Sequence, residues 1–256
     1  MAGSPRGLLE GGDRVALVTG AGQGIGLAIA ASLLADGHRV ALLDLDVERA
    51  GDAAAALDPS GERTLALGAN VGKPAEVEAA LDALVARWGW PAILVNNAAR
   101  TVARPVLEIP LEEWDDVLAT NLRSCLLLCQ RCAPSMRAAG WGRIVNMASL
   151  AGQQGGVTGG AHYAASKAGM IVLSKVLARE MASDGVTVNA VAPAAILTPV
   201  MESLGAERIA EIAEGIPIGR PGTSEEVASM VSYLCSNGAA FVTGATLDVN
   251  GGLSMR

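Results

Sequence analysis

The sequence alternates short apolar runs with longer segments of helical periodicity, and this alternation limits the possible folds more than any other feature. The apolar runs predict strands over residues 14–19, 39–44, 64–70, 92–96, 143–148, 186–191 and 245–249. Between them, helices are predicted over 25–35, over 74–88, from 110 to about 138, over 162–182 and over 224–235. Nearly all-apolar strands that alternate with helices indicate a parallel sheet with helices on both of its faces. The pattern therefore predicts an α/β fold.

Composition and organisation both indicate a single domain. Hydrophobic residues make up 51% of the 256 residues and charged residues 18%, which excludes a disordered chain. No linker rich in Pro, Gly or Ser and no internal repeat divides the sequence. Residues 1–12 lack the apolar region of a signal peptide, and we expect them to form a loose arm. Residues 194–222 interrupt the alternation with several prolines around a short helical piece, so we expect a substrate-binding lid there.

The charge and the cysteines exclude several classes of partner. A net charge of −7 without any basic run argues against nucleic acid and anionic membranes. No apolar stretch approaches the roughly 18 residues of a membrane span. Few cysteines and no export signal predict free thiols in a cytoplasmic protein. Cys125, Cys129 and Cys132 share one helix face, but no His or fourth Cys accompanies them, so burial or a subunit contact is favoured and no metal site is predicted.

A glycine-rich turn follows the first predicted strand and precedes a helix. Gly20, Gly24 and Gly26 allow the backbone to turn sharply and approach a pyrophosphate, which the N-terminus of the helix would bind. A merely tight turn would carry the same glycines, but Asp44 at the end of the next strand adds a second signal. A carboxylate there accepts hydrogen bonds from ribose hydroxyls and repels a 2′-phosphate, and Gln23 supplies no cation for one. Both residues favour NAD over NADP.

Tyr163 and Lys167 lie one helical turn apart on the same predicted helix face. A nearby ammonium favours the phenolate form of a tyrosine and brings its pKa towards neutral pH, where it can exchange a proton. Ser149 follows the fifth predicted strand, at the sheet edge where open α/β folds bind ligands. The Tyr-Lys spacing alone is more typical of an ordinary amphipathic helix, and its place behind a dinucleotide turn is what indicates catalysis.

Together these motifs resemble those of the short-chain dehydrogenase/reductase family. The residues that carry the resemblance, in the family's order and spacing, are Thr19, Gly20, Gly24, Gly26, Asn96, Asn97, Ala98, Ala99, Asn121, Ser149, Tyr163 and Lys167. The resemblance covers about residues 14–252. It implies a Rossmann-like, doubly wound parallel sheet of seven strands in three α/β/α layers. It also implies hydride transfer between a nicotinamide and an alcohol or ketone, carried out by a homotetramer.

The resemblance implies a role for each matching residue. Tyr163 would be the general acid/base and Ser149 would bind the substrate oxygen. Lys167 would lower the pKa of Tyr163 and bind the nicotinamide ribose, and Asn121 would hold a water that connects Lys167 to solvent. The residues expected to contact the dinucleotide are Gly20, Gln23, Gly24, Ile25, Gly26, Asp44, Asn70, Val71, Asn97, Ala98, Tyr163, Lys167, Pro193, Ile196 and Thr198.

Substrate contacts are less determined, because the sequence departs from the family pattern around them. Ala99 and Ala194 stand where the family usually has Gly, and each adds a methyl group close to the cofactor. The interval from Ser149 to Tyr163, which lines the substrate cleft in relatives, is longer than the family pattern and rich in glycine. The candidate substrate residues are Gln153, Gln154, His162 and Met201.

The sequence therefore predicts an NAD-dependent oxidoreductase that interconverts a secondary alcohol and its ketone. A polyol, a sugar derivative, a hydroxy acid and an apolar alcohol all stay open as the small-molecule substrate. The close alternative is a 3-oxoacyl-thioester reductase of the acyl-carrier-protein type, which by resemblance would use NADPH and need a basic docking patch. Asp44 and the charge of −7 argue against both requirements. A non-catalytic dinucleotide-binding protein is the alternative from another class, and the intact set of Asn121, Ser149, Tyr163 and Lys167 argues against it.

Overall fold

A computed structural model of the chain describes residues 13–156 and 159–255. Its strands are β1 (Val15–Thr19), β2 (Arg39–Asp44), β3 (Thr64–Gly68), β4 (Ile93–Asn96), β5 (Gly142–Met147), β6 (Val186–Pro193), β7 (Ile196–Leu197), β8 (Gly222–Thr223) and β9 (Thr246–Val249). Its longer helices are α1 (Gly24–Ala35), α2 (Val47–Leu57), α3 (Pro74–Trp88), α4 (Leu111–Leu118), α5 (Ser124–Ala139), α7 (Gly160–Met181), α9 (Ala206–Glu214) and α10 (Ser224–Cys235). Its shorter helical segments are η2 (Val106–Glu108), η3 (Ala119–Arg123), α6 (Ala151–Gln154), η4 (Ala182–Asp184), α8 (Pro199–Glu202) and η5 (Asn237–Ala239). The expected loose arm, residues 1–12, lies outside the described residues.

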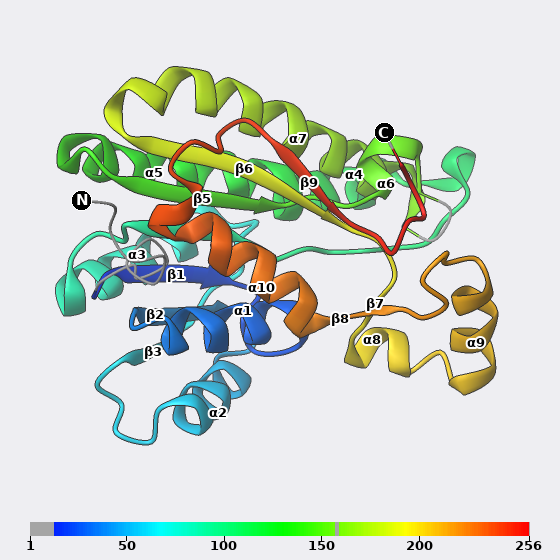
Figure 1. The fold of residues 1–256 in the computed structure, drawn as a ribbon, viewed down its shortest axis with the longest axis horizontal. Helices are drawn as coiled ribbons and strands as arrows, with labels where there is room; N and C mark the ends of the chain where they lie inside the picture. The colour runs from blue at the N-terminus through cyan, green and yellow to red at the C-terminus, as the bar shows by residue number, and fades with distance from the viewer. Residues whose placement is uncertain (1–12, 157–158, 256) are drawn as a thin grey trace, which may run out of the picture.

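Seven strands form one parallel sheet, which confirms the predicted doubly wound α/β fold (Figure 1). The strand order is β3-β2-β1-β4-β5-β6-β9. β1 pairs with β2 on one side and with β4 on the other, so the order reverses its direction at β1. Open parallel sheets bind their ligands beyond the carboxyl ends of the strands at such a reversal. The topology therefore places a binding site at this edge.

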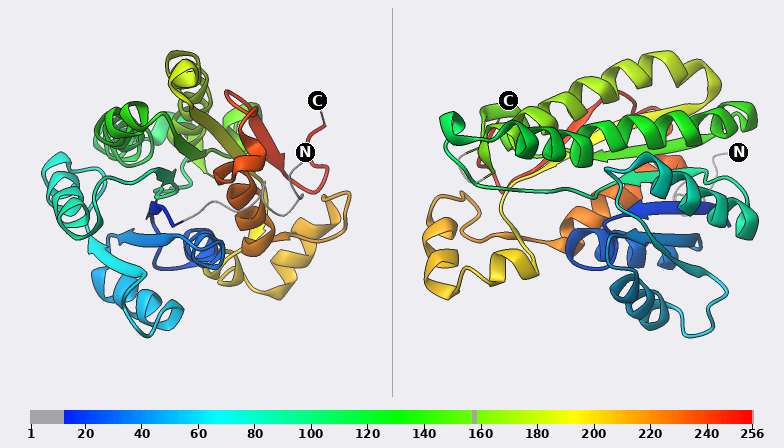
Figure 2. Two further views of the ribbon diagram at one scale, coloured as in Figure 1. Left: turned by 60° about the vertical axis from the view of Figure 1, so that its left-hand side comes forward. Right: turned by 180° about the vertical axis from the view of Figure 1, so that it is seen from behind.

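Helices cover both faces of the sheet, each set over its own apolar core (Figure 2). α3, α5 and α7 pack on one face, while α1, α2 and α10 pack on the other. The core consists mainly of Ala, Val, Leu and Ile, and β1 is buried along its whole length. Small side chains allow helices to approach the sheet closely. At Gly142 of β5, for example, a Cβ atom would lie only 2.6 Å from the Cβ of Met136 in α5.

The long helix predicted from residue 110 to about 138 is divided by a π turn. α4 ends at Leu118, the π turn η3 follows, and α5 begins at Ser124. Asn121 lies in this turn and is buried. Its side-chain oxygen accepts a hydrogen bond from the backbone N–H of Arg100 at 2.7 Å. Single π turns of this kind occur frequently at functional sites.

The helices α2 and α6 lie in segments for which no helix is predicted from the sequence. α2 begins directly after Asp46, whose side chain caps it by accepting a hydrogen bond from the N–H of Arg49. α6 is a four-residue turn inside the glycine-rich interval before Tyr163. Both helices flank the carboxyl edge of the sheet, so they shape the region in which the site residues gather.

Residues 194–222 fold into a small unit of their own. β7, α8, α9 and β8 follow one another there, and β7 pairs in parallel with β8. The unit lies beyond the carboxyl ends of the main strands, at the lower right of Figure 1. No residue of α9 is buried. The role of this segment as a substrate lid stays a prediction.

The cysteines lie in the interior of the protein. All four are free thiols and all are buried, and the three in α5 belong to the core on the sheet face that α3, α5 and α7 cover. Among residues 13–156 and 159–255, no group of His, Cys, Asp and Glu side chains has the arrangement of a metal site. None of the helices in these ranges combines the length and the apolar character needed to span a membrane.

Candidate active site

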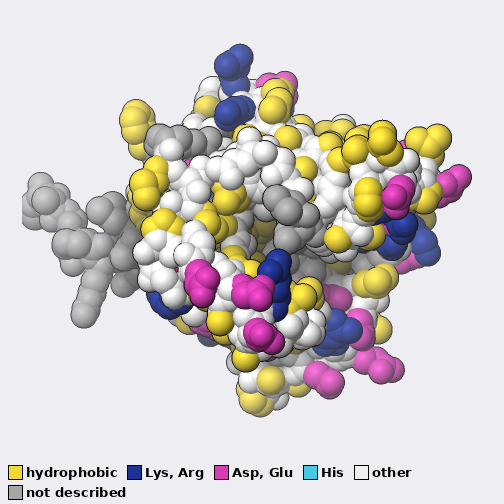
Figure 3. All heavy atoms as spheres, turned by 90° about the vertical axis from the view of Figure 1, so that its right-hand side faces the viewer, with side chains coloured by type: hydrophobic (Ala, Val, Ile, Leu, Met, Phe, Trp, Pro, Cys, Tyr) yellow, Lys and Arg dark blue, Asp and Glu magenta, His cyan; other side chains and the backbone are white. Residues whose placement is uncertain are grey.

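A cleft of about 630 Å³ opens where the strands of the main sheet end. Figure 3 looks onto this edge of the molecule, with acidic and basic side chains intermixed around a hollow. Every residue predicted to contact the dinucleotide lines the cleft, and so does Ser149. Other lining residues, which the sequence analysis did not select as site residues, are Leu43, Leu45, Arg49, Ala69, Arg100, Thr101, Asp116, Thr120, Met147, Ala148, Pro199 and Val200. Most of them belong to the end of a strand or to the loop after it, and that position is the signal that could have found them.

The turn between β1 and α1 has the shape of a phosphate cradle. Gly20 and Gly24 have φ angles of +64° and +56°, which L side chains rarely adopt. A Cβ atom on Gly26 would lie 2.1 Å from the carbonyl oxygen of Gly20, so helix and turn are in direct contact. Gln23, the N-cap residue of α1, makes no side-chain cap hydrogen bond, which leaves N–H groups of the first helical turn for a ligand. The residues present therefore fit a dinucleotide pyrophosphate.

Asp44 ends β2 at the wall of the cleft and holds this turn in place. Its carboxylate accepts a hydrogen bond of 2.9 Å from the Gly22 N–H and one of 3.1 Å from the Asp46 N–H. Arg49 also lines the cleft, but its guanidinium is paired with Asp46 at 2.7 Å. The net charge at this position is therefore negative, which suits hydroxyl groups that donate hydrogen bonds.

Tyr163 lies in the first turn of α7 and faces the cleft. The pKa of its phenol is raised above the ordinary value of a tyrosine, because burial outweighs the hydrogen bonds with the side chains of Ser149 and Thr101, which lower it. The expected lowering of this pKa by Lys167 does not overcome the effect of burial in the single chain. Ser149 follows β5 and Thr101 belongs to the loop after β4, so groups from two neighbouring strand ends converge on one phenol. The hydroxyl of Ser149 also accepts a hydrogen bond of 3.1 Å from the N–H of Ala151, which helps to orient it.

Lys167 lies one turn further along α7 and is buried. Its Nζ donates a hydrogen bond of 2.6 Å to the carbonyl oxygen of Met147 at the end of β5. The same nitrogen lies 5.6 Å from the centre of the Tyr163 ring. Burial lowers the pKa of the Lys167 ammonium to about 8, and the electrostatic effect of Cys125 opposes this shift. Lys167 therefore lies near the phenol and can release a proton close to neutral pH, whereas its ribose contact stays a prediction.

Asn121 does not line the cleft but fixes a segment that does. Besides accepting the Arg100 N–H, its side-chain nitrogen donates to the Arg100 carbonyl and to the hydroxyl of Ser166, each at 3.0 Å. These bonds join the π turn, the loop after β4 and α7. In this structure Asn121 acts as a structural tie, and its expected water relay to Lys167 stays a prediction.

The four candidate substrate residues are not brought into the cleft. His162 is fully buried, and its Nε2 lies 3.4 Å from the carboxylate of Glu113. The side-chain amide of Gln153 donates a hydrogen bond of 2.6 Å to Asp248. Both side chains are therefore occupied by partners within the protein.

The other two candidates are also directed elsewhere. Gln154 is exposed on α6, and Met201 is buried in α8. Val200, its neighbour in α8, lines the cleft in its place. Thr101 contributes a hydroxyl beside Tyr163 that the sequence analysis did not select. Its signal was its position shortly after Asn96, the last residue of β4, and the Asn-Ala-Ala sequence that follows it.

Comparisons with known proteins agree with this fold and this cleft. A family model described as enoyl-(acyl carrier protein) reductase matches residues 20–254. The chain belongs to the short-chain dehydrogenase/reductase family of oxidoreductases, which bind a nicotinamide dinucleotide. The fold and the site therefore define an oxidoreductase of this class.

Several relatives are similar to this chain over nearly their whole length. The 3-oxoacyl-[acyl-carrier-protein] reductase FabG of Escherichia coli strain K12 is 42% identical over 94% of this chain and 98% of that protein. FabG of Staphylococcus epidermidis is 38% identical over 95% of this chain and the full length of that protein. The crystal structure of a 3-oxoacyl-[acyl-carrier protein] reductase from Brucella melitensis matches with a TM-score of 0.91 at 32% identity. That match covers 100% of this chain and 98% of the other.

Proposed function

We propose that this protein reduces the ketone of a 3-oxoacyl thioester to the 3-hydroxyacyl thioester, with a nicotinamide dinucleotide as hydride donor. The observation that carries the proposal is the convergence of Ser149 and Lys167 on Tyr163, in the same cleft as the dinucleotide turn. Relatives named 3-oxoacyl reductases, at about 40% identity over most of the chain, support this substrate above the polyol, sugar or hydroxy acid expected from the sequence.

The reaction adds one hydride and one proton and leaves the thioester intact. A bound nicotinamide supplies the hydride for the carbon of the ketone. Tyr163 donates its phenolic proton to the ketone oxygen, and Ser149 donates a hydrogen bond to the same oxygen as negative charge develops there. Lys167 stabilises the resulting phenolate. Because the pKa of Lys167 is lowered to about 8, its ammonium can return a proton to the tyrosine near neutral pH.

The proposed donor is NADH rather than NADPH. Asp44 is 8% exposed and its carboxylate is held by two backbone N–H groups, so it cannot easily turn away from a ligand. The 2′-phosphate of NADPH would approach this carboxylate. The cation beside it, Arg49, is already balanced by Asp46. This combination departs from the NADPH use that the family resemblance implies for a 3-oxoacyl-thioester reductase.

The segment beside the cleft suits a substrate with an acyl chain. Val200 lines the cleft and is 71% exposed, and Leu204 in the same segment is 54% exposed. Exposed apolar groups next to a cleft are typical of ligand contacts. A hydrocarbon chain in the cleft would cover Val200, whereas a polyol or a sugar would leave it in water.

The experiment that tests the proposed function is a substrate panel with NADH and with NADPH. It contains acetoacetyl-CoA, a 3-oxoacyl group on acyl carrier protein, crotonyl-CoA as an enoyl thioester, and a set of polyols and hydroxy acids for the reverse direction. We expect oxidation of NADH with the 3-oxoacyl thioesters. Turnover of the enoyl thioester alone, or of polyols without any thioester, would overturn the proposal.

Two further expectations from the sequence remain part of the proposal, a homotetramer and a cytoplasmic location. Apolar side chains on the outer faces of α5 and α7, Leu126, Val172 and Val176, are exposed in the single chain and suit a subunit contact. Light scattering coupled to size-exclusion chromatography measures the assembly, and a monomer at micromolar concentration would contradict the first expectation.

A further inference from the structure

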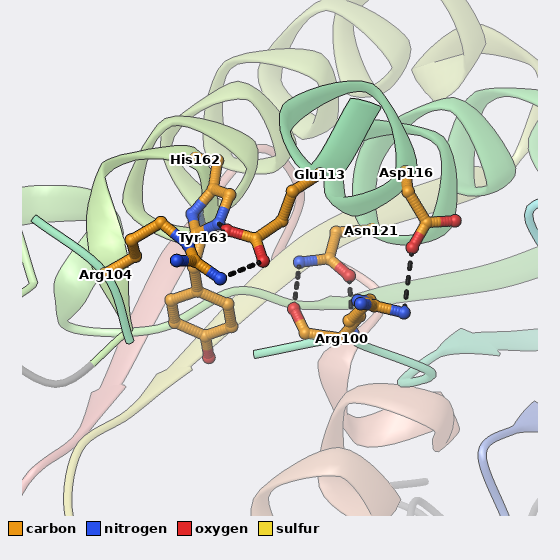
Figure 4. A network of polar contacts seen from close by, with 7 residues as sticks. All are labelled: Arg100, Arg104, Glu113, Asp116, Asn121, His162 and Tyr163. Atoms are coloured by element: carbon orange, nitrogen blue, oxygen red, sulfur yellow. Dashed lines mark hydrogen bonds and ion pairs between the residues drawn. The ribbon is translucent and has the colours of Figure 1, made fainter. Parts of the chain in front are cut away.

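The residue that precedes Tyr163 belongs to a chain of hydrogen bonds behind the cleft (Figure 4). His162 is fully buried, and its Nδ1 accepts a hydrogen bond of 3.0 Å from the N–H of Tyr163. Its Nε2 lies 3.4 Å from Oε1 of Glu113 in α4. Glu113 in turn receives two bonds from Arg104 in the loop after β4, at 2.8 Å and 3.1 Å. One imidazole therefore connects three separate segments.

The two contacts of His162 define which nitrogen of its ring accepts and which donates. Nδ1 accepts from a backbone amide and therefore carries no proton. Nε2 carries the proton of the neutral ring and donates it to Glu113. A second proton would direct an N–H group at the N–H of Tyr163 and break that bond. The charged groups on this side of the ring are Glu113 and, behind it, Arg104, whose hydrogen bonds lower the pKa of the Glu113 carboxyl.

The bond to Tyr163 fills a gap at the start of α7. The first N–H groups of a helix have no partner within it, and Gly159, the N-cap residue, supplies none from a side chain. Packing is also tight here. A Cβ atom on Gly159 would lie 2.5 Å from the ring of Tyr163, and one on Gly160 would lie 2.7 Å from both the His162 ring and the Val102 carbonyl oxygen. The start of α7 and the loop after β4 are therefore in direct contact.

The same loop carries a group that binds the phenol of Tyr163. Thr101 lines the cleft, and its side chain forms a hydrogen bond with Tyr163. Arg104, further along this loop, anchors it to Glu113. The backbone N–H of the tyrosine and its phenol are thus both tied to one loop, from opposite ends of the residue. Figure 4 shows the phenol oxygen pointing away from the His162 ring.

We propose that His162 is a positioning residue that fixes Tyr163 in the cleft. Through Glu113 and Arg104 it ties the tyrosine to the loop that also binds the phenol. This inference rests on the proposed function, in which Tyr163 donates the proton. It gives His162 a role behind the helix in place of the substrate contact expected from the sequence.

Two substitutions separate the two contacts of the ring. In His162→Asn, the amide oxygen can replace Nδ1 and accept from the N–H of Tyr163, while the link to Glu113 is lost. In His162→Gln, the amide nitrogen can replace Nε2 and donate to Glu113, while the bond to the Tyr163 N–H is lost. Arg137→Gln removes an exposed ion pair with Asp184 outside the cleft and is the matched control.

The kinetic prediction distinguishes these variants. For His162→Gln we expect kcat to fall by about 10- to 100-fold with the KM for NADH within about twofold of wild type, because small displacements of reacting groups are costly. For His162→Asn we expect a smaller loss, and for Arg137→Gln none. Wild-type kcat in His162→Gln, or a larger loss in His162→Asn than in His162→Gln, would overturn the proposal.

Titration of the phenol by ultraviolet absorbance gives a measurement that needs no turnover. The chain has two tyrosines, so Tyr163→Phe identifies the signal that belongs to Tyr163. Displacement from Ser149 and Thr101 removes the hydrogen bonds that lower the pKa of this phenol. We therefore expect His162→Gln to raise that pKa, and His162→Asn, which keeps the bond to the Tyr163 N–H but loses the link to Glu113, to raise it less. An unchanged titration in His162→Gln overturns the positioning role, whereas a wild-type protein inactive on thioesters overturns only the proposed function.

A second variant covers the case in which His162→Gln does not fold. Glu113→Gln keeps the shape of the side chain and removes the charge that holds both His162 and Arg104. The positioning role requires the pKa of Tyr163 to rise in this variant as well. A Glu113→Gln protein with the circular dichroism spectrum and the tyrosine titration of wild type would contradict it.

Discussion

Replacing Asp44 by asparagine removes one negative charge from the wall of the cleft and keeps the size of the side chain. The carboxylate accepts hydrogen bonds from the N–H groups of Gly22 at 2.9 Å and of Asp46 at 3.1 Å. An asparagine oxygen can accept one of these bonds, but the amide NH2 then faces the other N–H. The loss of one hydrogen bond to a charged group lowers the free energy of unfolding by about 1.5–3 kcal/mol.

The larger effect of Asp44→Asn is expected on the choice of dinucleotide. Two unit charges about 4 Å apart interact by about 4 kcal/mol at the effective dielectric constant of about 20 found near protein surfaces. Water and salt at the mouth of a cleft screen this repulsion, and about half of it, roughly 2 kcal/mol, corresponds to a factor of about 30. We therefore expect the NADH-to-NADPH ratio of kcat/KM to fall by about 30-fold, mainly through faster reaction with NADPH.

The assay measures steady-state rates with each dinucleotide at a saturating concentration of a 3-oxoacyl thioester. Asp52→Asn is the matched control, because Asp52 is exposed on α2, lies outside the cleft and carries the same charge. Its dinucleotide ratio should equal that of wild type. Equal use of NADPH and NADH by the wild-type protein, or a ratio in Asp44→Asn within about threefold of wild type, would refute the electrostatic reasoning.

Three further predictions concern the tyrosine, the lysine and the π turn. Gly159→Ala places a methyl group where a Cβ would lie 2.5 Å from the Tyr163 ring, so kcat falls at least about tenfold while NADH binding, measured by fluorescence, is unchanged. Lys167→Met removes a buried ammonium whose pKa is lowered by burial from 10.5 to about 8. Near pH 7 we therefore expect the free energy of unfolding of this inactive variant, measured in urea, to exceed that of wild type by about 3 kcal/mol. That gain shrinks as the pH rises from about 8 to 10.5, because the folded lysine loses its proton before the unfolded one does. Asn121→Ala leaves the N–H and the carbonyl of Arg100 without their partner and lowers the free energy of unfolding in urea by about 2–4 kcal/mol.

Each of these predictions has a clear contrary result. Gly51→Ala, where nothing lies within 4 Å of the added Cβ, is the control for Gly159→Ala and should keep full activity. Equal activity of the two alanine variants would contradict the contact with the tyrosine ring. A Lys167→Met protein less stable than wild type near pH 7, or an Asn121→Ala protein as stable as wild type, would contradict the contacts assigned to those residues.

The dinucleotide turn could be located from the sequence because its signals are local. Gly20 and Gly24 need positive φ angles, and this requirement falls on single residues rather than on distant contacts. Strands buried on both faces are apolar along their length, so their ends are visible in the sequence. Parallel strands end at one edge of the sheet, which brings Asp44 and Ser149 to one cleft without any knowledge of tertiary contacts.

His162 shows what a local pattern could not reveal. Neighbours on a helix point about 100° apart, so when Tyr163 faces the cleft, His162 faces away from it. Adjacency in sequence suggested a shared substrate contact, and helix geometry separates the two side chains. The partner that explains the histidine, Glu113, is 49 residues away in the chain, and no spacing rule connects them.

The π turn was hidden for a related reason. Helical periodicity runs on from α4 into α5, and one widened turn hardly alters the spacing of apolar residues. The bonds that accompany the turn join Asn121 to Arg100 and Ser166, 21 and 45 residues away. α2, in contrast, had a local signal in the capping residue Asp46, which directly precedes the helix.

The central claim is that Tyr163 donates the proton when a 3-oxoacyl thioester is reduced. Its most direct test is single-turnover hydride transfer from NADH to acetoacetyl-CoA in the wild-type protein and in Tyr163→Phe, with NADH affinity measured in parallel. We expect the rate of hydride transfer to fall by about 10²- to 10⁴-fold in the variant, the usual contribution of a general acid, while the Kd for NADH stays within about twofold of wild type. Hydride transfer at nearly the wild-type rate in Tyr163→Phe would contradict the claim.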